Sequence, residues 1–352
     1  MIDWHSTMDQ TYEFYKVNPA SWHDEELLTC VQSCSISRDL SSNTLGSATI
    51  DTTENLGECY IRVYLSVHQN GEYDKIPLGT YLIQTPSVSF DGMIHKYSLD
   101  AYTPLLELKG TIPPIGYALL KGQNIMEIAT QLCRENMRAP VVDTSSHHTL
   151  ASNFVANLDD TWLTFITDLI SNAKYSLSLD GLGRVLFSPE QDTASLRPVW
   201  TYDDSDISIL YPEVTDSRDL YNIPNVVEVV YSTDTSYLVA RAVNDDRSSP
   251  VSTVSRGREI VYRESNPSVI GTPDQAYLNE YAKQLLRNLS SLEHTVTYKH
   301  GYCPVQVGDC ITLNYGRSGL SDIKARVISQ TITCETGCPV EETAVYTTKL
   351  WG

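Results

Sequence analysis

Four cysteines near the end of the chain carry the most specific potential chemistry. Cys303, Cys310, Cys334 and Cys338 all follow residue 300, and four converging thiolates would suit a zinc ion or an iron–sulfur cluster. Paired zinc ligands usually have two, and at most about four, residues between them, whereas six residues lie between Cys303 and Cys310. We therefore expect buried thiols, with no metal and no cofactor, and keep a structural metal as the alternative.

A second cysteine pair, Cys30 and Cys34, lies in a segment with strand-like composition. An even spacing puts both side chains on one face of a strand, about 13 Å apart. That separation is too large for one disulfide or one metal ion. The start of the chain lacks the basic and apolar segments of a signal peptide, so we expect the eight cysteines to be reduced.

Other groups that could do chemistry have simpler explanations. His147-His148 lies among serine and threonine, which is typical of a solvated loop, and a metal site would need more ligands nearby. Asp203-Asp204-Ser205-Asp206 lacks the central glycine and the later glutamate of a calcium loop. A glycosidase needs two carboxylates about 5–10 Å apart across a cleft, and adjacency in sequence does not provide this. A solvated surface or helix capping is the simpler explanation for Glu25-Glu26, Asp159-Asp160, Asp203-Asp204, Asp245-Asp246 and Glu341-Glu342.

The common enzyme motifs are absent from the sequence. It contains no Walker loop, no Gly-x-Gly-x-x-Gly after a strand, no His-Glu-x-x-His and no Gly-x-Ser-x-Gly. A cysteine–histidine hydrolase stays an alternative, although no local signature selects one pair among eight cysteines and eight histidines. The sequence therefore predicts a protein without a catalytic site.

Composition narrows the class further. The 352 residues carry a formal net charge of −19, which argues against a general nucleic-acid binder and against docking on anionic membranes. The proportions of 41% hydrophobic and 20% charged residues are those of a globular protein. No apolar stretch approaches the roughly 18 residues of a membrane helix. The 22 tyrosines, against 5 phenylalanines and 5 tryptophans, suit either large interfaces or strand filling, and both explanations stay open.

Three folded regions and an arm must position these groups. Residues 1–26 are aromatic without a period and predict an irregular N-terminal arm. Residues 27–105 predict a β domain, because residues 60–67 alternate between apolar and polar side chains and turn signals follow at Asn70-Gly71 and Asp91-Gly92. Residues 106–212 predict an α/β region with helices near 124–136 and 160–172 and a hairpin around Asp180-Gly181.

The last region, residues 213–352, is again mostly β, with an inserted helical segment at about 240–291. A dense strand is expected at 226–231 and a helix near 273–289, and further strands follow to the end of the chain. The fold class is therefore α+β and mainly β. The recurrence of β character at both ends suggests two related β-barrel domains with α/β elements between them.

The order of these features resembles the tail hub of phages and related injection machines, the family of the contractile-tail baseplate hub and the late control tail protein. The resemblance spans roughly residues 27–350 and depends on runs that are individually weak. These runs are Ser33-Cys34-Ser35-Ile36-Ser37-Arg38, Leu45-Gly46-Ser47-Ala48-Thr49-Ile50, Ile76-Pro77-Leu78-Gly79-Thr80-Tyr81-Leu82-Ile83, the helix after Gly122, Leu179-Asp180-Gly181-Leu182-Gly183-Arg184-Val185-Leu186-Phe187, Tyr221-Asn222-Ile223-Pro224-Asn225-Val226 and Val305-Gln306-Val307-Gly308-Asp309-Cys310-Ile311. The aromatic arm departs from the family pattern. The chain also ends at Gly352 without a spike, lysozyme or peptidase segment.

The resemblance implies a structural virion protein at the tail tip or baseplate, assembled in the host cytoplasm. It implies a homotrimer whose ring of six barrels adapts the sixfold tail tube to a threefold spike. The implied partners are the tail tube or distal tail protein, the central spike or tip protein and the baseplate wedge proteins, with DNA only in transit and no membrane anchoring. A tail-associated peptidoglycan hydrolase and a carbohydrate-binding β module are the alternatives.

The negative charge has a possible role in such a ring. Cations lining a DNA channel would bind phosphates, whereas acidic or neutral groups would repel DNA weakly within about 8–10 Å of the wall. We expect the wall to be mainly Asp, Glu, Ser and Thr, with Asp51, Glu54 and Glu228 as candidate lining residues. The alternative is that the charge only favours solubility.

Overall fold

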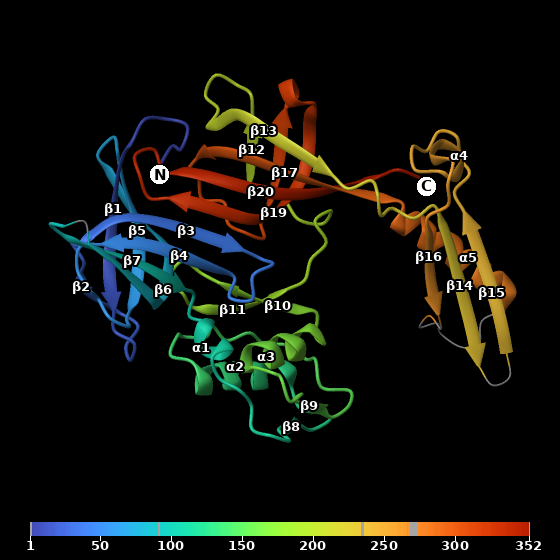
Figure 1. Cartoon of the computed structure of the whole chain (residues 1–352), viewed down its shortest axis with the longest axis horizontal. Helices are drawn as coiled ribbons and strands as arrows, with labels where there is room; N and C mark the ends of the chain where they lie inside the picture. Colours follow the sequence, from blue (N-terminus) through green and yellow to red (C-terminus); the bar gives the residue numbers. More distant parts are fainter. Residues whose placement is uncertain (1, 91, 234–235, 266, 268–273, 352) are drawn as a thin grey trace. The chain divides into compact units, whose positions relative to one another are not determined.

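A computed structural model describes residues 2–90, 92–233, 236–265, 267 and 274–351 (Figure 1). The fold is mainly β with a few helices, as predicted. The helices are α1 (Leu106–Lys109), α2 (Ile125–Asn136), α3 (Trp162–Ser171), α4 (Thr253–Arg256), α5 (Gln275–Leu289) and the 3-10 turn η1 (Gly316–Ser318). The strands are β1 (Asp9–Val17), β2 (Asp24–Leu27), β3 (Val31–Asp39), β4 (Gly46–Thr52), β5 (Tyr60–Gln69), β6 (Glu72–Phe90), β7 (His95–Tyr102), β8 (Ala118–Leu119), β9 (Phe154–Val155), β10 (Tyr175–Leu179), β11 (Val185–Pro189), β12 (Trp200–Asp203), β13 (Leu210–Arg218), β14 (Val226–Thr233), β15 (Ser236–Val243), β16 (Val261–Ser265), β17 (Ser291–Gly301), β18 (Cys310–Tyr315), β19 (Leu320–Thr333) and β20 (Pro339–Lys349).

One large sheet joins the two β regions that the sequence predicted. Its strand order is β13-β17-β20-β19-β3-β4-β7-β6-β5-β1-β2, and β18 pairs with both β19 and β12. The junction is the antiparallel pair β3–β19, in which Ser35 lies opposite Thr333. The early and late strands therefore share backbone hydrogen bonds, although almost 300 residues separate them in sequence.

The N-terminal arm is ordered sheet, and the prediction of an irregular arm over residues 1–26 was wrong. β1 pairs with β5 along its whole length, and β2 pairs with β1. No period was visible in the sequence because aromatic side chains occupy both faces of β1. Phe14 packs into the core, whereas the ring of Tyr15 lies outside against the Lys75 ammonium, 4.2 Å from its centroid.

The residues before β1 and around β2 also pack against the rest of the chain. Trp4 packs edge-on against Tyr302, with ring centroids 5.3 Å apart. His5 stacks on Trp200 at 5.2 Å. Trp22 packs against Tyr60 at 4.9 Å. The aromatic residues that the sequence left unplaced thus attach the arm to three separate elements.

The middle α/β region is built as predicted around two amphipathic helices. The side chain of Asn124 caps α2 by accepting from the amides of Met126 and Glu127. Thr161 is the N-cap of α3 and forms a capping box with Thr164. The cap therefore lies one residue after Asp159-Asp160, the pair for which helix capping was one expected role. The apolar faces of both helices share one core with the inner face of β10–β11.

The turn between β10 and β11 approaches β6 so closely that it needs glycine. A Cβ added at Gly181 would lie 2.2 Å from the Pro77 carbonyl oxygen, and one at Gly183 would lie 2.7 Å from Thr80 Cβ. The Leu182 carbonyl between them accepts from the Trp22 indole at 2.8 Å. Backbone proximity therefore holds the middle region against the first β region.

We expect Gly181→Ala to lower the free energy of unfolding by about 1–3 kcal/mol, because the added methyl group must displace backbone. Urea unfolding followed by circular dichroism measures the change. Gly110→Ala is the matched control, because its Cβ would meet its nearest neighbour at 3.4 Å, an ordinary contact. Equal losses in the two variants would show that the close approach is not the cause.

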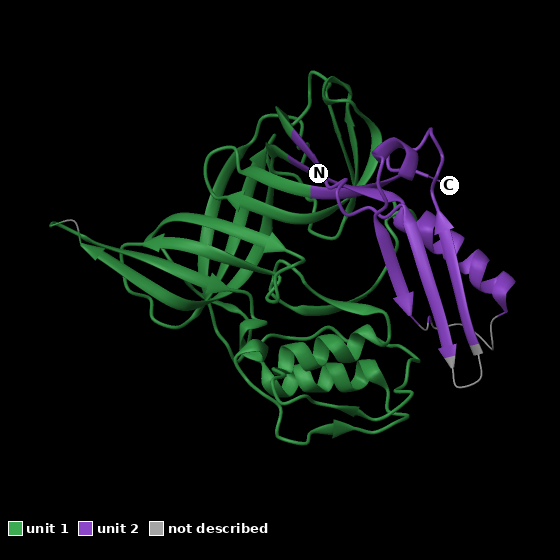
Figure 2. Ribbon diagram, turned by 45° about the vertical axis from the view of Figure 1, so that its right-hand side comes forward, with its two compact units in different colours: residues 1–214, 298–343 green, residues 215–297, 344–352 purple. Residues whose placement is uncertain are grey.

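The chain divides into two compact units (Figure 2). Unit 1 comprises residues 1–214 and 298–343, and unit 2 comprises residues 215–297 and 344–352. Unit 2 contains a three-stranded sheet, β15-β14-β16, with α5 packed on one face through Leu278, Ala282 and Leu286. The inserted segment predicted at 240–291 contains the predicted helix as α5, and it also contains α4, the end of β15 and all of β16, while residues 266 and 268–273 lie outside the described part of the chain. β14 was predicted, whereas β15 and β16 were missed because exposed apolar and charged side chains interrupt their apolar alternation.

Candidate functional site

Small hydroxyl side chains line the outward face of five neighbouring strands of unit 1. One row of directly paired residues crosses β19, β3, β4, β7 and β6 in the order Thr333, Ser35, Thr49, Asp100 and Thr85. Parallel rows extend it on either side. We call this surface the hydroxyl face, and it consists of Ser33, Ser35, Ser37, Ser47, Thr49, Asp51, Thr85, Ser87, Ser98, Asp100, Thr331 and Thr333.

Strand alternation produces this face. Cys34 and Ile36 on β3, and Ala48 and Ile50 on β4, point into the core and are buried. The residues between them are therefore turned outward. The signal was present in the sequence as the run Ser-Cys-Ser-Ile-Ser beginning at Ser33, but the pairing that assembles five such strands was not.

The electrostatics of the hydroxyl face are weakly negative. Its two charged members are Asp51 and Asp100, and none of its twelve residues is Lys or Arg, although Lys96 follows beyond its edge on the same side of β7, opposite Ser89. The Ser33 hydroxyl donates to Asp51 Oδ2 at 2.6 Å. Such a surface offers hydroxyl groups to water and no cation to a phosphate, so a polyanion would not adhere to it.

The three candidate lining residues belong to two different units of the chain. Asp51 is part of the hydroxyl face, and Glu54 is exposed in the loop after β4, where its carbonyl accepts from Thr52 Oγ1 at 2.8 Å. Glu228 belongs to unit 2 and is contacted by Arg263 Nε at 2.8 Å and Arg241 Nε at 3.4 Å. Its side-chain hydrogen bond to Arg263 lowers the pKa of Glu228. The two arginines balance its charge, so Glu228 adds little to a negative wall.

A second polar site is fully buried between β12, β17, β19 and β20. His300 Nε2 lies 3.1 Å from the Tyr202 hydroxyl and 3.5 Å from Glu342 Oε2. Gln330 Nε2 donates to the same oxygen, Glu342 Oε2, at 2.6 Å. The Tyr298 hydroxyl also donates to Glu342. Glu342 has no exposed surface, so the expectation of a solvated Glu341-Glu342 pair was wrong for its second member. Alternation along β20 turns Glu341 out to Lys299, at 3.2 Å, and Glu342 in.

Burial and hydrogen bonding compete at His300. Burial alone would lower its pKa, but hydrogen bonds to Cys303 and Glu342 and the nearby negative charge outweigh it and raise the pKa to about 10. Burial and the Glu342 charge raise the pKa of Tyr298. The cluster therefore favours the charged imidazolium form of His300 beside the buried Glu342 side chain.

The cluster does not form a working hydrolase centre. It brings Cys303 close to His300, but His300 Nδ1 lies 2.7 Å from the Gly301 carbonyl oxygen and 4.0 Å from the Cys303 sulfur. Cys303 and His300 are each about 1% exposed, which leaves no surface on which a substrate could reach the sulfur. This arrangement favours a role in stability.

The four terminal cysteines do not converge, because only Cys334 and Cys338 share one loop. Cys303 belongs to the buried cluster, and Cys310 starts β18. Cys334 and Cys338 flank a tight loop, in which the Cys338 amide donates to the Glu335 carbonyl at 2.9 Å. Cys334 lies beside Cys34 across the β3–β19 pair, and its amide donates to the Cys34 carbonyl at 2.9 Å. Among the residues that the structure describes, no group of three or more His, Cys, Asp or Glu is arranged to hold a metal ion.

We expect purified protein to contain well under one zinc or iron per chain. A hydrogen bond to Cys34 and burial raise the pKa of Cys334, and burial raises the pKa of Cys338 to about 12. Both groups are therefore thiols at neutral pH, whereas a metal needs thiolates. Elemental analysis measures this. A stoichiometric metal that is lost in Cys334→Ser, but kept in Cys133→Ser, would contradict it.

The remaining candidate groups serve local structure. Asp203 Oδ1 accepts from the Ser205 hydroxyl at 2.8 Å, which closes a turn. His148 lies near Tyr175, with ring centroids 6.5 Å apart. Trp22 and Trp162 belong to the core of the middle region, whereas Trp4 and Trp200 lie in the packing of the arm. The tryptophans therefore do not gather in one sugar-binding cleft. Within the described part of the chain, no helix has the length and apolar character needed to cross a membrane.

Comparison by sequence identifies no relative. No protein-family model matches the chain, and no curated protein matches it significantly.

Comparison of structures does identify similar proteins. A tail protein from Neisseria meningitidis MC58 is 13% identical, with a TM-score of 0.63 over 96% of this chain and 97% of that one. The 43 kDa tail protein of prophage MuSo2 from Shewanella oneidensis is 11% identical, with a TM-score of 0.64 over 96% and 98%. A chain of a Francisella PdpA–VgrG complex is 9% identical, with a TM-score of 0.58 over 96% of this chain and 58% of that one. The resemblance noted in the sequence is thus confirmed at the level of fold, and the chain has the fold of phage and prophage tail proteins.

Proposed function

We propose that this chain is a structural hub protein of a phage tail or phage-like particle, working as a homotrimer at the tail tip. Two observations support the proposal. The fold matches tail proteins over nearly their full length, and the hydroxyl face offers a cation-free wall of the kind a DNA passage needs. The second observation carries the proposal, because it follows from this chain's own residues.

The proposed work is mechanical. Three copies form a ring that joins the sixfold tail tube, or a distal tail protein, to a threefold spike or tip protein. Baseplate wedge proteins contact its outer side, and DNA passes through it when the tail fires. The hydroxyl face lines the passage, with Asp51 and Asp100 as its charged members and Glu54 at its end. The protein is assembled in the host cytoplasm and is carried in the virion.

Imaging of the purified protein or of tail particles by electron cryo-microscopy tests the proposal. The expected result is a threefold ring with the hydroxyl face on its inner wall. A twofold assembly would overturn the hub assignment. A ring whose inner wall carries Lys and Arg, with the hydroxyl face outside, would overturn the role of that face.

A paired substitution tests the passage directly. Thr49→Lys with Ser98→Lys should leave assembled particles intact but slow DNA release, since each cation binds phosphate. Gln131→Lys on the exposed side of α2 adds charge away from the face and is the control. Equal release in all three proteins would contradict the role of the wall.

Purified protein should also give no clearing on a peptidoglycan zymogram, whereas a cleared zone would favour the hydrolase alternative.

A further inference from the structure

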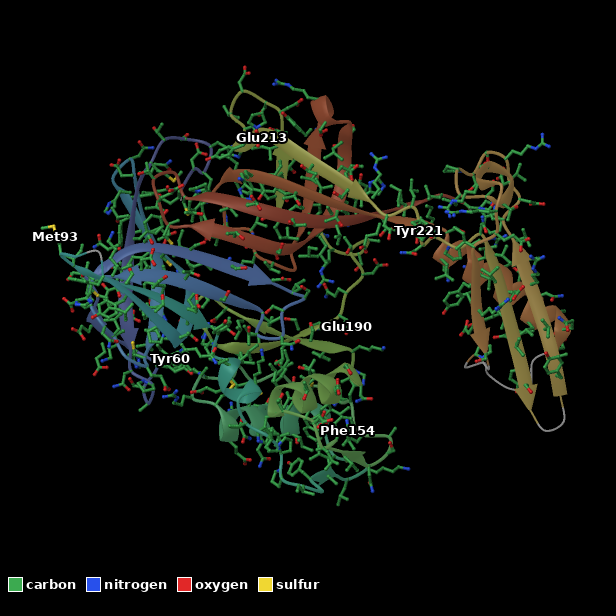
Figure 3. All side chains as sticks on the ribbon, viewed as in Figure 1. Tyr60, Met93, Phe154, Glu190, Glu213 and Tyr221 are labelled. Atoms are coloured by element: carbon green, nitrogen blue, oxygen red, sulfur yellow. The ribbon has the colours of Figure 1, made fainter. Side chains whose placement is uncertain are left out.

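A pair of cysteines lies where the early and the late strands of unit 1 meet. We call this place the seam, and it consists of the antiparallel pair β3–β19, which joins β1–β7 to β13 and β17–β20 in the large sheet. Figure 3 shows Tyr60 of β5 and Glu213 of β13 on opposite sides of it. Cys34 lies on β3, and Cys334 directly follows β19. The two cysteines are 300 positions apart in the sequence.

The backbone register puts the two cysteines directly opposite each other. Ile36 pairs with Ile332 and Ser35 with Thr333, so the next pair in the same register is Cys34 with Cys334. The Cys334 amide donates to the Cys34 carbonyl at 2.9 Å, which is the bond of a closely hydrogen-bonded pair. The Cα atoms of such a pair lie about 5.5 Å apart. Disulfides join Cα atoms that are about 4.4–6.8 Å apart, so the backbone already has the spacing that a disulfide needs.

The two side chains also point in the same direction. Residues directly opposite each other in an antiparallel pair share one face of the sheet. On this face Ile36 and Ile332 are buried, and both Cys34 and Cys334 pack in the same core. The two side chains are hydrogen bonded to each other, and both are free thiols. A disulfide would therefore need only a small movement of the sulfur atoms.

The two sulfurs differ in how easily a reagent reaches them. Cys34 is 3% exposed, whereas Cys334 is only partly buried. The hydrogen bond to Cys34 and burial raise the pKa of Cys334, so little of it is thiolate at neutral pH and thiol–disulfide exchange starts slowly. Such a pair stays reduced in a cytoplasm that keeps thiols reduced, and it reacts only on long exposure to an oxidant.

We propose that Cys34 and Cys334 are an oxidation site, which closes into a disulfide across the seam when the chain meets a small-molecule disulfide. The Cys334 thiolate attacks one sulfur of that molecule, forms a mixed disulfide and releases one thiol. The Cys34 sulfur then attacks the Cys334 sulfur and releases the second thiol. The two cysteine protons end on the two released thiols, so the cysteines lose two electrons and the small disulfide gains two.

The new bond would fix the seam covalently. Within the described residues, β3–β19 is the strand pair that joins the early strands of the large sheet to the late ones. A disulfide there also closes a loop of about 300 residues, which restricts the unfolded chain. The chemistry of the pair does not depend on the proposed function, but the occasion for it does, because a tail protein leaves the reducing cytoplasm when the particle is released.

Peptide mapping of oxidised protein tests the site. The purified full-length chain is incubated with oxidised glutathione until its thiol count stops falling, the remaining thiols are alkylated, and cross-linked peptides are identified by mass spectrometry. Most copies should contain the Cys34–Cys334 cross-link, and their unfolding temperature should be higher than that of reduced protein by roughly 5 °C or more. Cys338→Ser is the matched control and should form the same cross-link. Cys34→Ser should lose both the cross-link and most of the increase.

Three results would overturn the site. A cross-link between Cys334 and Cys338 would show that oxidation closes the loop and leaves the seam open. Glutathione retained on Cys334, or alkylation of both Cys34 and Cys334, would show that the folded chain does not bring the two sulfurs together. An unchanged unfolding temperature in cross-linked protein would contradict the locking of the seam.

Tail particles separate this inference from the hub assignment. Particles purified without reductant should contain the cross-link, whereas protein alkylated inside the host cell should lack it. Fully reduced particles with a threefold ring would overturn the role of the pair after release and leave the hub assignment intact. A cross-link that forms in purified protein, together with a twofold assembly in images, would support the oxidation site and overturn the hub assignment.

Discussion

Replacing Arg62 with methionine should lower the free energy of unfolding by about 3–5 kcal/mol. Arg62 is 3% exposed and connects three segments that are distant in sequence. Its guanidinium donates to Asp24 Oδ1 at 2.7 Å, Thr80 Oγ1 at 2.9 Å and the Leu182 carbonyl at 3.2 Å. It also donates to the Trp22 carbonyl at 3.2 Å. Methionine fills similar space but leaves these acceptors without a donor, and each unsatisfied buried group costs about 1–3 kcal/mol.

The measurement is urea unfolding, and the control is Arg134→Met. Arg134 makes an ion pair of the same length, 2.7 Å to Asp143, but the two side chains are 51% and 79% exposed. Exposed pairs contribute about 0–1 kcal/mol, so this variant should be nearly neutral. Limited proteolysis adds a second readout, because loss of Arg62 should open the arm around residues 18–24 to cleavage. Similar losses in both variants would show that Arg62 does not connect the segments.

The sequence predicted those elements whose residues are close together in the chain. The helix α2 was predictable because Ile125, Ala129 and Cys133 recur at the helical period and Asn124 can cap it. The strand β5 was predictable from its alternation, although the structure buries nearly all of its residues on both faces. In both cases one segment carries the whole pattern.

The strands of the N-terminal arm and of unit 2 were harder to predict from the sequence, for different physical reasons. In β1, Tyr12, Phe14 and Tyr15 put aromatic rings on both faces, so no period of two was visible. In unit 2, the face of β14–β16 away from α5 carries Glu228, Arg241 and Arg263, which pair with one another. A strand whose charges are satisfied across the sheet gives a weak apolar alternation in its own sequence.

The hydroxyl face depends on pairing between strands that are distant in sequence, and no single segment encodes that pairing. The run beginning at Ser33 shows one hydroxyl-lined strand, but the hydroxyl face forms only when β3 pairs with β19 and β4. The same holds for Arg62, whose acceptors come from the arm, from β6 and from the turn at Leu182. Sequence therefore identified candidate side chains such as Asp51, and tertiary pairing decided what surrounds them.

The buried His300 cluster should make stability fall with rising pH. The pKa of His300 is raised from 6.5 to about 10 in the folded protein. The folded state therefore holds a proton that the unfolded chain releases above pH 6.5. This contribution is fully present below pH 6.5 and is lost as the pH rises to about 10, at up to about 1.4 kcal/mol per pH unit.

The informative quantity is the difference in unfolding free energy between wild type and His300→Gln, because other groups that titrate in this range cancel from it. Urea unfolding at half-unit steps from pH 6 to pH 9.5 should show wild type more stable than His300→Gln by several kcal/mol at pH 6. This difference in unfolding free energy should become steadily smaller as the pH rises. Glu342→Gln supplies a second test, since it removes the negative charge that supports the proton. In the Glu342→Gln background, the stabilisation that depends on His300 should be lost at a lower pH than in wild type. A gap that is the same at every pH would mean that His300 is neutral in the folded protein. The cluster would then stabilise the sheet by hydrogen bonding alone.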